Sequence, residues 1–443
     1  MLLTIEKLVY GGDGLSHLPA DASGPGKAVF VPFVLPGEKV EASVTEEKPG
    51  FARARVENLG ETSPHRIEPR CPYFKQCGGC HYQHIDYQQQ LEIKQEILRE
   101  TLWRTAKLEL PVEMQVHRSP PWNYRNRSRL QVESNPEFKI GYFKMRSHEV
   151  LPVELCPISS PLINRGIELL WQSGRTGKVP AGIREIEFFV NADDSRMLVE
   201  ISCSQDARRA AVRAWGEELC AAMPEIAGCA AFRQSSAAPQ KREKVVVVGS
   251  DHISYEAGRF RHRVSAGAFF QVNRHLTSEL VEIVTTGQRG ELALDLYAGA
   301  GLFSTALARD IDHIVSVESS PPSSADLAHN LPSNGEAVQA TTEQYLAARE
   351  NKGRLGKGAV LPPDVPTPEL AVVDPPRNGL GERVARMLAT LGAARLVYVS
   401  CDPATLARDL IVLLGSGYRI EQAHLVDLFP QTYHIESVVH LAR

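Results

Sequence analysis

The stretch ALDLYAGAG, residues 293–301, decides the fold of the C-terminal part of the chain. Its apolar first half predicts a buried strand, and its glycine-rich second half predicts a tight turn before a helix. Glycine lets the backbone approach a ligand at the carboxyl end of a strand. The next predicted strand, His313–Glu318, ends in an acid that can accept both hydroxyls of a ribose. The pattern fits S-adenosylmethionine as well as a nucleotide, and the plain alternative is a tight turn without a ligand.

The sequence on both sides of this stretch predicts an α/β domain over residues 266–443, in which helices alternate with strands. Further strands are expected at Glu369–Val373, Arg395–Ser400 and Glu436–Leu441. Such alternation is typical of a parallel, Rossmann-like sheet, in which ligands bind at the carboxyl ends of the strands. Residues 353–368 are rich in glycine and proline and predict a surface loop.

Three motifs that can carry chemistry stand beside predicted strands of this domain. DPPR (374–377) places a carboxylate before two prolines, which stiffen the loop, and it resembles a motif of methyltransferases that act on nucleobases. SCDP (400–403) places Cys401 at a strand end, where a thiolate of modest pKa would be a strong nucleophile; an inert buried cysteine is the alternative. QTYHIE (431–436) adds two candidate general bases, His434 and Glu436.

The N-terminal 60 residues predict a different fold. Short β-rich runs at Ala28–Val34, Lys39–Val44 and Ala52–Leu59 are separated by glycine turns, a pattern that indicates a small OB-like β-barrel. Residues 61–265 then predict an α+β domain, with a helix over Tyr87–Arg104 and a long β-rich stretch interrupted by a helix near Ala207–Met223. We therefore expect a multidomain α/β protein.

Four cysteines of this central part are candidate metal ligands. Cys71, Cys77 and Cys80 fall within one short loop, and Cys156 stands in a Cys-Pro context like Cys71. Three thiolates in one loop and a distant fourth can hold a metal centre, and both zinc and an iron–sulfur cluster are compatible with the spacing.

Composition excludes several classes of protein. The 443 residues are 43% hydrophobic and 23% charged, as in ordinary globular chains and unlike disordered, collagenous or coiled-coil ones. No apolar run approaches the roughly 18 residues of a membrane span, and MLLTIEKLVYGG at the start does not resemble a signal peptide. We expect a cytoplasmic protein without membrane association.

The distribution of charge along the chain is more informative about a binding partner than the net charge is. The net charge is −4, from 49 Lys and Arg against 53 Asp and Glu, so bulk charge does not indicate nucleic acid. Between Arg118 and His148, however, basic residues are interleaved with aromatic ones. This mixture is typical of RNA binding, with a solvated strand face as the alternative.

Together these motifs resemble those of the RNA (uracil-5-)-methyltransferases, in the branch that carries a TRAM domain and a [4Fe–4S] cluster. The chain is most similar to the bacterial 23S rRNA enzymes. The resemblance rests on CPYFKQCGGC (71–80) with Cys156-Pro157, on FFQVN (269–273), on SCDPATLARD (400–409) and on TYHIE (432–436). Three positions depart from the family pattern: Asp402 replaces Asn, while Ala298 and Leu302 replace Cys and Asn.

The resemblance implies a division into a TRAM barrel (1–60), a central iron–sulfur and RNA-binding domain (61–265) and a class I methyltransferase domain (266–443). It implies that S-adenosylmethionine is bound by Gln271, Tyr297, Glu318 and Asp374. Cys401 would add to carbon 6 of a uracil, and Glu436 would remove the proton from carbon 5. The [4Fe–4S] cluster would be held by Cys71, Cys77, Cys80 and Cys156.

The implied partner is RNA, with rRNA favoured over tRNA, and the implied state is a monomer. Two alternatives remain at this point. A cytosine-5 methyltransferase would use the same thiol addition, and a non-catalytic iron–sulfur protein could bind RNA through the barrel and the cysteine loop.

Overall fold

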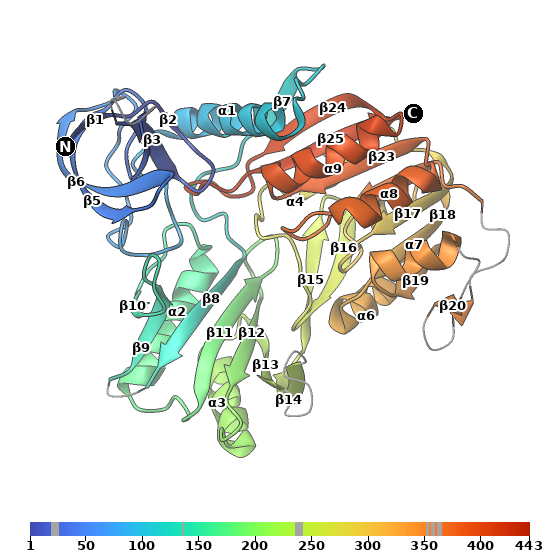
Figure 1. The fold of residues 1–443 in the computed structure, drawn as a ribbon. Helices are drawn as coiled ribbons and strands as arrows, with labels where there is room; N and C mark the ends of the chain where they lie inside the picture. The colour runs from blue at the N-terminus through green and yellow to red at the C-terminus, as the bar shows by residue number, and fades with distance from the viewer. Residues whose placement is uncertain (19–25, 135–136, 235–241, 351–353, 356–358, 361–365) are drawn as a thin grey trace.

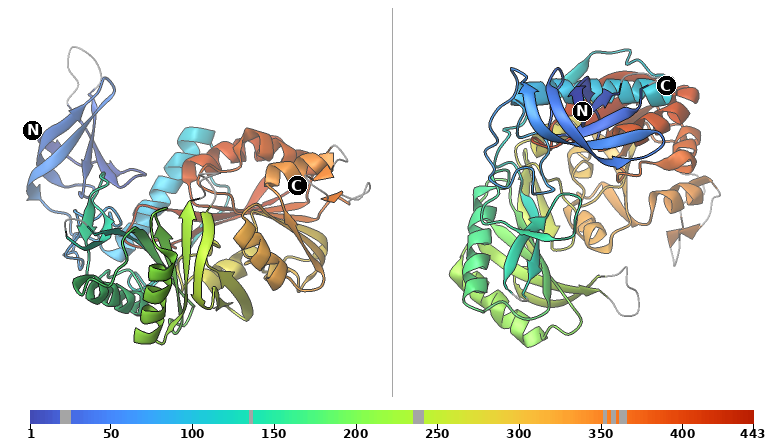
Figure 2. Two further views of the ribbon diagram at one scale, coloured as in Figure 1. Left: turned by 90° about the horizontal axis from the view of Figure 1, so that it is seen from below. Right: turned by 60° about the vertical axis from the view of Figure 1, so that its left-hand side comes forward.

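The computed structural model describes residues 1–18, 26–134, 137–234, 242–350, 354–355, 359–360 and 366–443. The described residues form three large β-sheets, and the N-terminal sheet lies at one end of the molecule (Figures 1 and 2). Most of the predicted loop 353–368 lies outside the described residues, apart from the short paired strands β20 (Arg354–Leu355) and β21 (Ala359–Val360). None of the helices among the described residues is both long enough and apolar enough to cross a membrane.

The N-terminal sheet has six strands in the order β1-β5-β6-β4-β3-β2. Their bounds are Leu2–Thr4, Lys7–Leu8, Asp13–His17, Ala28–Pro32, Lys39–Glu47 and Phe51–Glu61 for β1 to β6. Alternate residues such as Val29 and Val31 point inward and are fully buried, as the period of two in a strand requires. Strands β1 and β2 end the hydrogen-bonded order, so the predicted closure into a barrel is not confirmed.

The central sheet has seven strands in the order β10-β9-β8-β11-β12-β13-β14. Their bounds are Arg127–Glu133, Lys139–Phe143, Val150–Pro152, Ile183–Val190, Met197–Cys203, Ile226–Gln234 and Arg242–Gly249 for β8 to β14. Helices α2 (Pro161–Arg175) and α3 (Arg209–Ala222) pack on this sheet, and α3 matches the helix predicted near 207–223. Only β12 and β13 run parallel, which agrees with an α+β arrangement.

The C-terminal sheet has eight strands in the order β19-β18-β17-β22-β23-β25-β24-β7. The first five are parallel, so the predicted Rossmann-like core is confirmed. The strand bounds are Met114–His117 (β7), Gly290–Leu296 (β17), Ile311–Glu318 (β18), Gly335–Gln339 (β19), Leu370–Val373 (β22), Arg395–Ser400 (β23), Arg419–Val426 (β24) and Glu436–Ala442 (β25). The helices are α4 (Thr277–Thr285), α5 (Ser304–Leu307), α6 (Pro321–Asn330), α7 (Thr342–Glu350), α8 (Gly381–Leu391) and α9 (Pro403–Gly415).

One strand runs against the expected parallel order. β25 is antiparallel to both β23 and β24. The connection between β24 and β25, residues 427–435, contains no helix, and parallel neighbours need a crossover connection of a dozen or more residues. A hairpin is therefore the arrangement that this short connection permits.

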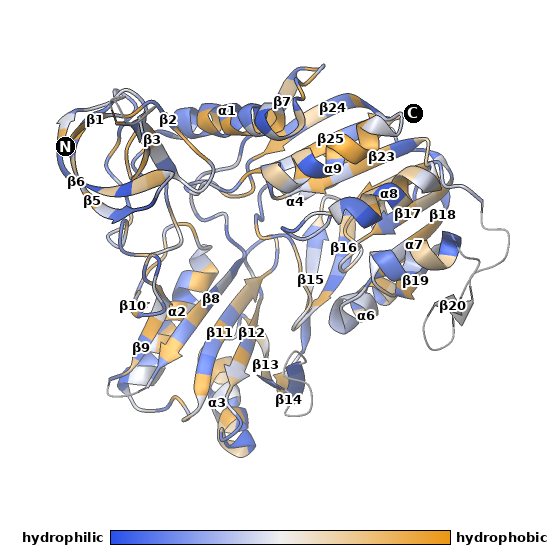
Figure 3. Cartoon of the chain, in the orientation of Figure 1, coloured by the Kyte–Doolittle hydropathy of each residue, from blue (hydrophilic) through white to orange (hydrophobic). Residues whose placement is uncertain are grey.

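Helix α1 (Tyr87–Ala106) precedes the central sheet in sequence but packs on α9, and β7 pairs with β24. Polar and apolar residues alternate along α1 (Figure 3), and its buried side includes Leu91 and Leu98. A hairpin, β15 (His252–Ala257) with β16 (Phe260–Ser265), contributes to the same core as the eight-stranded sheet. The domain boundaries at 60 and 265 remain predictions, because the 61–265 segment has elements in two of the large sheets.

Candidate active site

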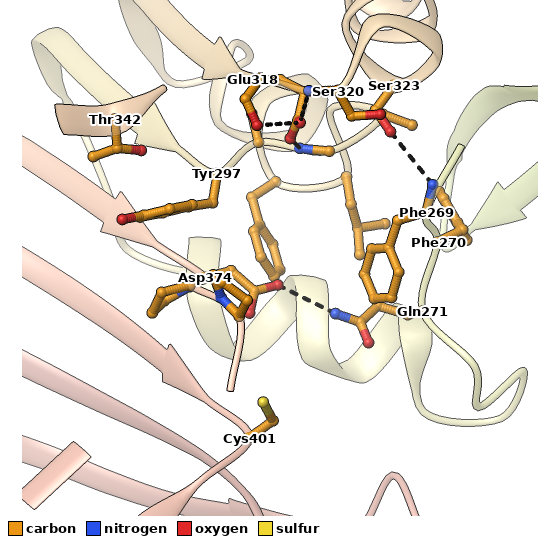
Figure 4. Close-up of a pocket in the computed structure, with 18 of the residues that line it drawn as sticks. Phe269, Phe270, Gln271, Tyr297, Glu318, Ser320, Ser323, Thr342, Asp374 and Cys401 are labelled. Carbon is orange, nitrogen blue, oxygen red and sulfur yellow. Dashed lines mark hydrogen bonds between the residues drawn. The ribbon is translucent and has the colours of Figure 1, made fainter. Parts of the chain in front are cut away.

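A cavity of about 670 Å³ lies at the carboxyl ends of the parallel strands (Figure 4). Glu318 ends β18, and Asp374 and Cys401 follow β22 and β23, so that neighbouring strands bring all three to one edge of the sheet. All six predicted catalytic and cofactor residues line this cavity: Gln271, Tyr297, Glu318, Asp374, Cys401 and Glu436. The structure thus brings together residues from six separate segments.

The turn after β17 is strongly bent. Tyr297, Gly299 and Gly301 have φ values of 65°, 57° and 87°, a region that costs a non-glycine residue free energy. The turn carries Ala298 and Leu302, two of the positions that depart from the family pattern, into the cavity wall. Their apolar side chains extend the hydrophobic lining of the pocket.

Glu318 is fixed by the backbone on both sides. Its Oε2 accepts the N–H of Gly299 at 2.9 Å, and its Oε1 accepts the N–H of Ser320 at 2.6 Å. Gln271, from the segment after β16, donates from Nε2 to Oδ2 of Asp374 at 3.3 Å (Figure 4). These contacts hold the polar groups of the cofactor side of the cavity in place.

Two carboxyl groups lie at the strand ends: Asp295 is buried, and Asp374 is partly exposed to the cavity. Burial raises the pKa of Asp295 to about 7. Burial and the neighbouring charge of Asp295 raise the pKa of Asp374 to about 7. Because a carboxylate removed from water lacks solvation, this pair favours a cation nearby.

Cys401 follows β23 and precedes α9. Asp402, the departure from Asn, caps α9 through hydrogen bonds from the N–H groups of Ala404 and Thr405 at 3.0 and 2.9 Å, a role that Asp and Asn fill equally well. Burial, followed by the charges of Glu436 and other acids, raises the pKa of the Cys401 thiol to about 12.

The two candidate bases differ in basicity. Burial, with the charge of Arg377 next in size, lowers the pKa of His434 to about 3. Its Nε2 lies 3.4 Å from Nη2 of Arg377. Burial and the charge of Asp374 instead raise the pKa of Glu436 well above its usual range. Of the two groups, Glu436 is the stronger proton acceptor.

Sequence reasoning gave no role to three residues beside Cys401. Arg377 and Phe429 line the same cavity, and the charge of Arg377 opposes the rise in the Cys401 pKa. Tyr10, from the turn between β2 and β3, donates a long hydrogen bond of 3.5 Å to the Cys401 carbonyl. The DPPR motif contains Arg377, so its position was a usable signal, whereas no local pattern points to Phe429 or Tyr10.

The four candidate metal ligands come together at a second site. Cys71, Cys77, Cys80 and Cys156 line a cavity of about 270 Å³, and all four are free thiols. Burial is the main cause that raises the pKa of the first three. Within the described ranges, no group of three or more His, Cys, Asp or Glu side chains is arranged to hold a metal ion. The cysteines converge as predicted, but a cluster is not shown.

The basic stretch from Arg118 to His148 is only partly free. Arg127 and Arg129 of β8 both donate to Glu187, at 3.2 and 2.8 Å. Arg125 lines the cysteine cavity. Part of the charge in this stretch thus serves contacts within the protein, and an RNA-binding face here stays a prediction.

Comparison with known proteins agrees with this geometry. Residues 86–443 match the family model for tRNA (uracil-5-)-methyltransferase, and residues 1–56 match the TRAM domain. An uncharacterized RNA methyltransferase of Aquifex aeolicus is 34% identical over 440 residues, which cover 98% of this chain and 97% of the relative. One of Halalkalibacterium halodurans is 31% identical over 98% of this chain and 95% of its own length.

Among solved structures, the tRNA (uracil-54, C5)-methyltransferase of Pyrococcus abyssi, in complex with S-adenosyl-L-homocysteine, has the same fold. It aligns over 100% of both chains with a TM-score of 0.74 and 23% sequence identity. The family model covers most of the chain, and its match includes the cavity, Cys401 and Glu436. The chain therefore belongs to the tRNA (uracil-5-)-methyltransferase family and is an RNA methyltransferase with an N-terminal TRAM domain.

Proposed function

We propose that this enzyme methylates carbon 5 of one uridine in RNA, with 23S rRNA as the target and tRNA as the alternative. One observation carries the proposal: a single cavity is lined both by the predicted cofactor residues and by Cys401 and Glu436. A methyl donor and an extruded base can therefore be bound side by side in this cavity, so that methyl transfer takes place between two groups that the enzyme already holds. The family makes a non-catalytic RNA-binding protein untenable.

S-adenosylmethionine would supply an electrophilic methyl group on a sulfonium. Glu318 is suited to the ribose hydroxyls, because its carboxylate is already oriented by the Gly299 and Ser320 N–H groups. Gln271 and Tyr297 would flank the bound molecule. Asp374 lies between this group and Cys401, and it influences the pKa of both Cys401 and Glu436.

Cys401 would be the nucleophile. Its Sγ forms a bond to carbon 6 of the uracil as the thiol proton leaves to a neighbouring carboxylate, and electron density moves to carbon 5. Carbon 5 would then take the methyl group, as the bond from the methyl group to the sulfonium breaks and S-adenosylhomocysteine leaves. Glu436 removes the proton from carbon 5, and the bond from Sγ to carbon 6 breaks to restore the ring. Glu436 suits this step better than His434 does, because its pKa is raised and that of His434 is lowered.

The support for a [4Fe–4S] cluster is the chemistry of the residues: four thiols from two distant segments line one cavity, and thiolates are the ligands that such a cluster takes. Cys71, Cys77, Cys80 and Cys156 would hold it as thiolates, and such a cluster would join the cysteine loop to the segment that follows β10. We assign the cluster a structural role, because the reaction needs no electron transfer: the leaving group is an intact thioether, and the proton goes to a base.

Mass-spectrometric mapping of 5-methyluridine tests the function. RNA from a strain lacking the gene should lose the modification at one uridine of 23S rRNA, and the purified enzyme should restore it. Loss from tRNA alone would move the assignment to tRNA. Loss of 5-methylcytidine with no change in uridine methylation would contradict the proposal.

A further inference from the structure

The 427–435 loop, between β24 and β25, joins two parts of the active site. Phe429 and His434 line the cavity from this loop, and Glu436 follows it directly as the first residue of β25. The loop has no helix or strand of its own, so its shape depends on contacts with other segments.

Lys94 of α1 contacts this loop. Its side chain is 0% exposed and that of Asp427 is 1% exposed. Lys94 Nζ donates to Oδ1 of Asp427 at 2.6 Å and to the Phe429 carbonyl at 3.0 Å. A buried ion pair often contributes no more stability than two apolar side chains of similar volume. Its presence on the apolar side of an amphipathic helix therefore calls for a reason other than stability.

Gln90, one turn earlier on α1, holds the next part of the loop. Its Nε2 donates to Oε1 of Gln431 at 3.1 Å, and its Oε1 accepts the Gln431 N–H at 3.0 Å. Gln431 has φ of 68°, a conformation that a side chain disfavours unless its surroundings impose it. The N–H groups of His81 and Tyr82 add two hydrogen bonds of 2.9 Å to the Gln431 carbonyl.

From the loop, contacts continue to the nucleophile. The Phe429 ring packs on the His434 ring with centroids 5.5 Å apart. His434 Nε2 lies 3.4 Å from the guanidinium of Arg377, whose charge lowers the pKa of Cys401. A shift of the loop would thus move both Glu436 and the cation that favours the thiolate.

We propose that Lys94 is a positioning residue for methyl transfer, and that its bonds to Asp427 and to the Phe429 carbonyl fix the loop that presents His434 and Glu436. The proposal rests on the proposed function of Cys401 and Glu436. Lys94 touches neither the cofactor residues nor Cys401 in this structure; it acts through the loop.

A double substitution separates the effect of Lys94 on the position of the 427–435 loop from its effect on the stability of the protein. Lys94→Met alone leaves the Asp427 carboxylate buried without its cation and will lower stability. The double variant Lys94→Met/Asp427→Leu removes both charges and puts apolar side chains of similar length in their place, so its melting temperature should stay near that of the parent. Arg99→Met is the control, because Arg99 is an exposed cation on the same helix.

We expect the double variant to lose about a hundredfold in kcat, as for a misplacement of roughly 1 Å, while the dissociation constant for S-adenosylmethionine changes less than about twofold. Hydrogen exchange of the 427–435 amides should rise, and Arg99→Met should match the parent in every measurement. A stable double variant with parental kcat and parental exchange overturns the proposal, and so does one that melts far below the parent. If the parent transfers no methyl group, the proposed function fails, and the exchange measurement alone decides the role of Lys94.

Discussion

The pH dependence of cofactor affinity offers a direct test of the active-site electrostatics. Desolvation and the neighbouring charge of Asp295 raise the pKa of Asp374 to about 7. We place the sulfonium next to Asp374, because this residue lies between the cofactor group and the groups that flank the base. The positive charge of a bound sulfonium favours the ionised form of Asp374. Below pH 7, Asp374 must therefore release a proton when S-adenosylmethionine binds, whereas above pH 7 it is already ionised.

The expected magnitude follows from this pKa. The ionised fraction of a group with a pKa of 7 rises about tenfold between pH 6 and pH 8, so the affinity for S-adenosylmethionine should rise about tenfold, or about 1.4 kcal/mol. S-adenosylhomocysteine is the control, because it carries the same ammonium, carboxylate and adenosine but no charge on sulfur. The ratio of the two dissociation constants therefore isolates the sulfonium.

Isothermal titration calorimetry at constant ionic strength, in two buffers of different ionisation enthalpy, measures both the affinity and the released proton. Asp374→Asn should abolish the pH dependence of the ratio and lower the affinity for S-adenosylmethionine at pH 8. If the ratio is the same at pH 6 and pH 8 in the parent protein, Asp374 does not lie beside the sulfonium.

Four further outcomes follow from the assigned roles. Cys401→Ala should abolish methylation and leave calorimetric cofactor binding intact; turnover near the parental rate would contradict its role as nucleophile. Glu436→Gln should stop the reaction after methyl transfer, so that a covalent protein–RNA adduct appears on denaturing gels, and its absence would favour His434 as the base. Glu318→Ala should weaken S-adenosylhomocysteine binding about tenfold to a hundredfold, from the loss of charge-assisted hydrogen bonds, and unchanged affinity would refute contact with the ribose. Cys77→Ser should lose iron and lower the melting temperature and RNA affinity while cofactor affinity persists, whereas a methylation rate that follows the redox potential of an intact cluster would refute a structural role.

The sequence predicted which strand-end residues meet at the cavity, because their meeting follows a local rule. Each parallel strand ends at the same edge of the sheet, so the residue that ends a strand lies near the cavity whatever the rest of the chain does. Glu318, Asp374 and Cys401 were placed in this way, and the structure brings them together. The antiparallel direction of β25 was missed, since strand patterns carry no direction.

Local sequence patterns could not predict the contacts between residues that lie far apart in the chain. Lys94 meets Asp427 across 333 positions of sequence, and Tyr10 meets Cys401 across 391. The only local trace of the first contact is a lysine on the apolar side of α1, between Leu91 and Leu98. Periodicity shows that such a lysine is buried, but it does not show which carboxylate faces it.

The environment of Cys401 gives a reason to expect that the reactivity of its thiol depends on the bound methyl donor. Burial and nearby acids raise the pKa of its thiol to about 12, which disfavours the thiolate. Arg377 opposes this rise with a single positive charge. A sulfonium beside Asp374 would add a second positive charge and offset one of the acids that disfavour the thiolate. The thiol would then become a nucleophile only when the methyl donor is in place, and this order would protect a reactive cysteine from side reactions.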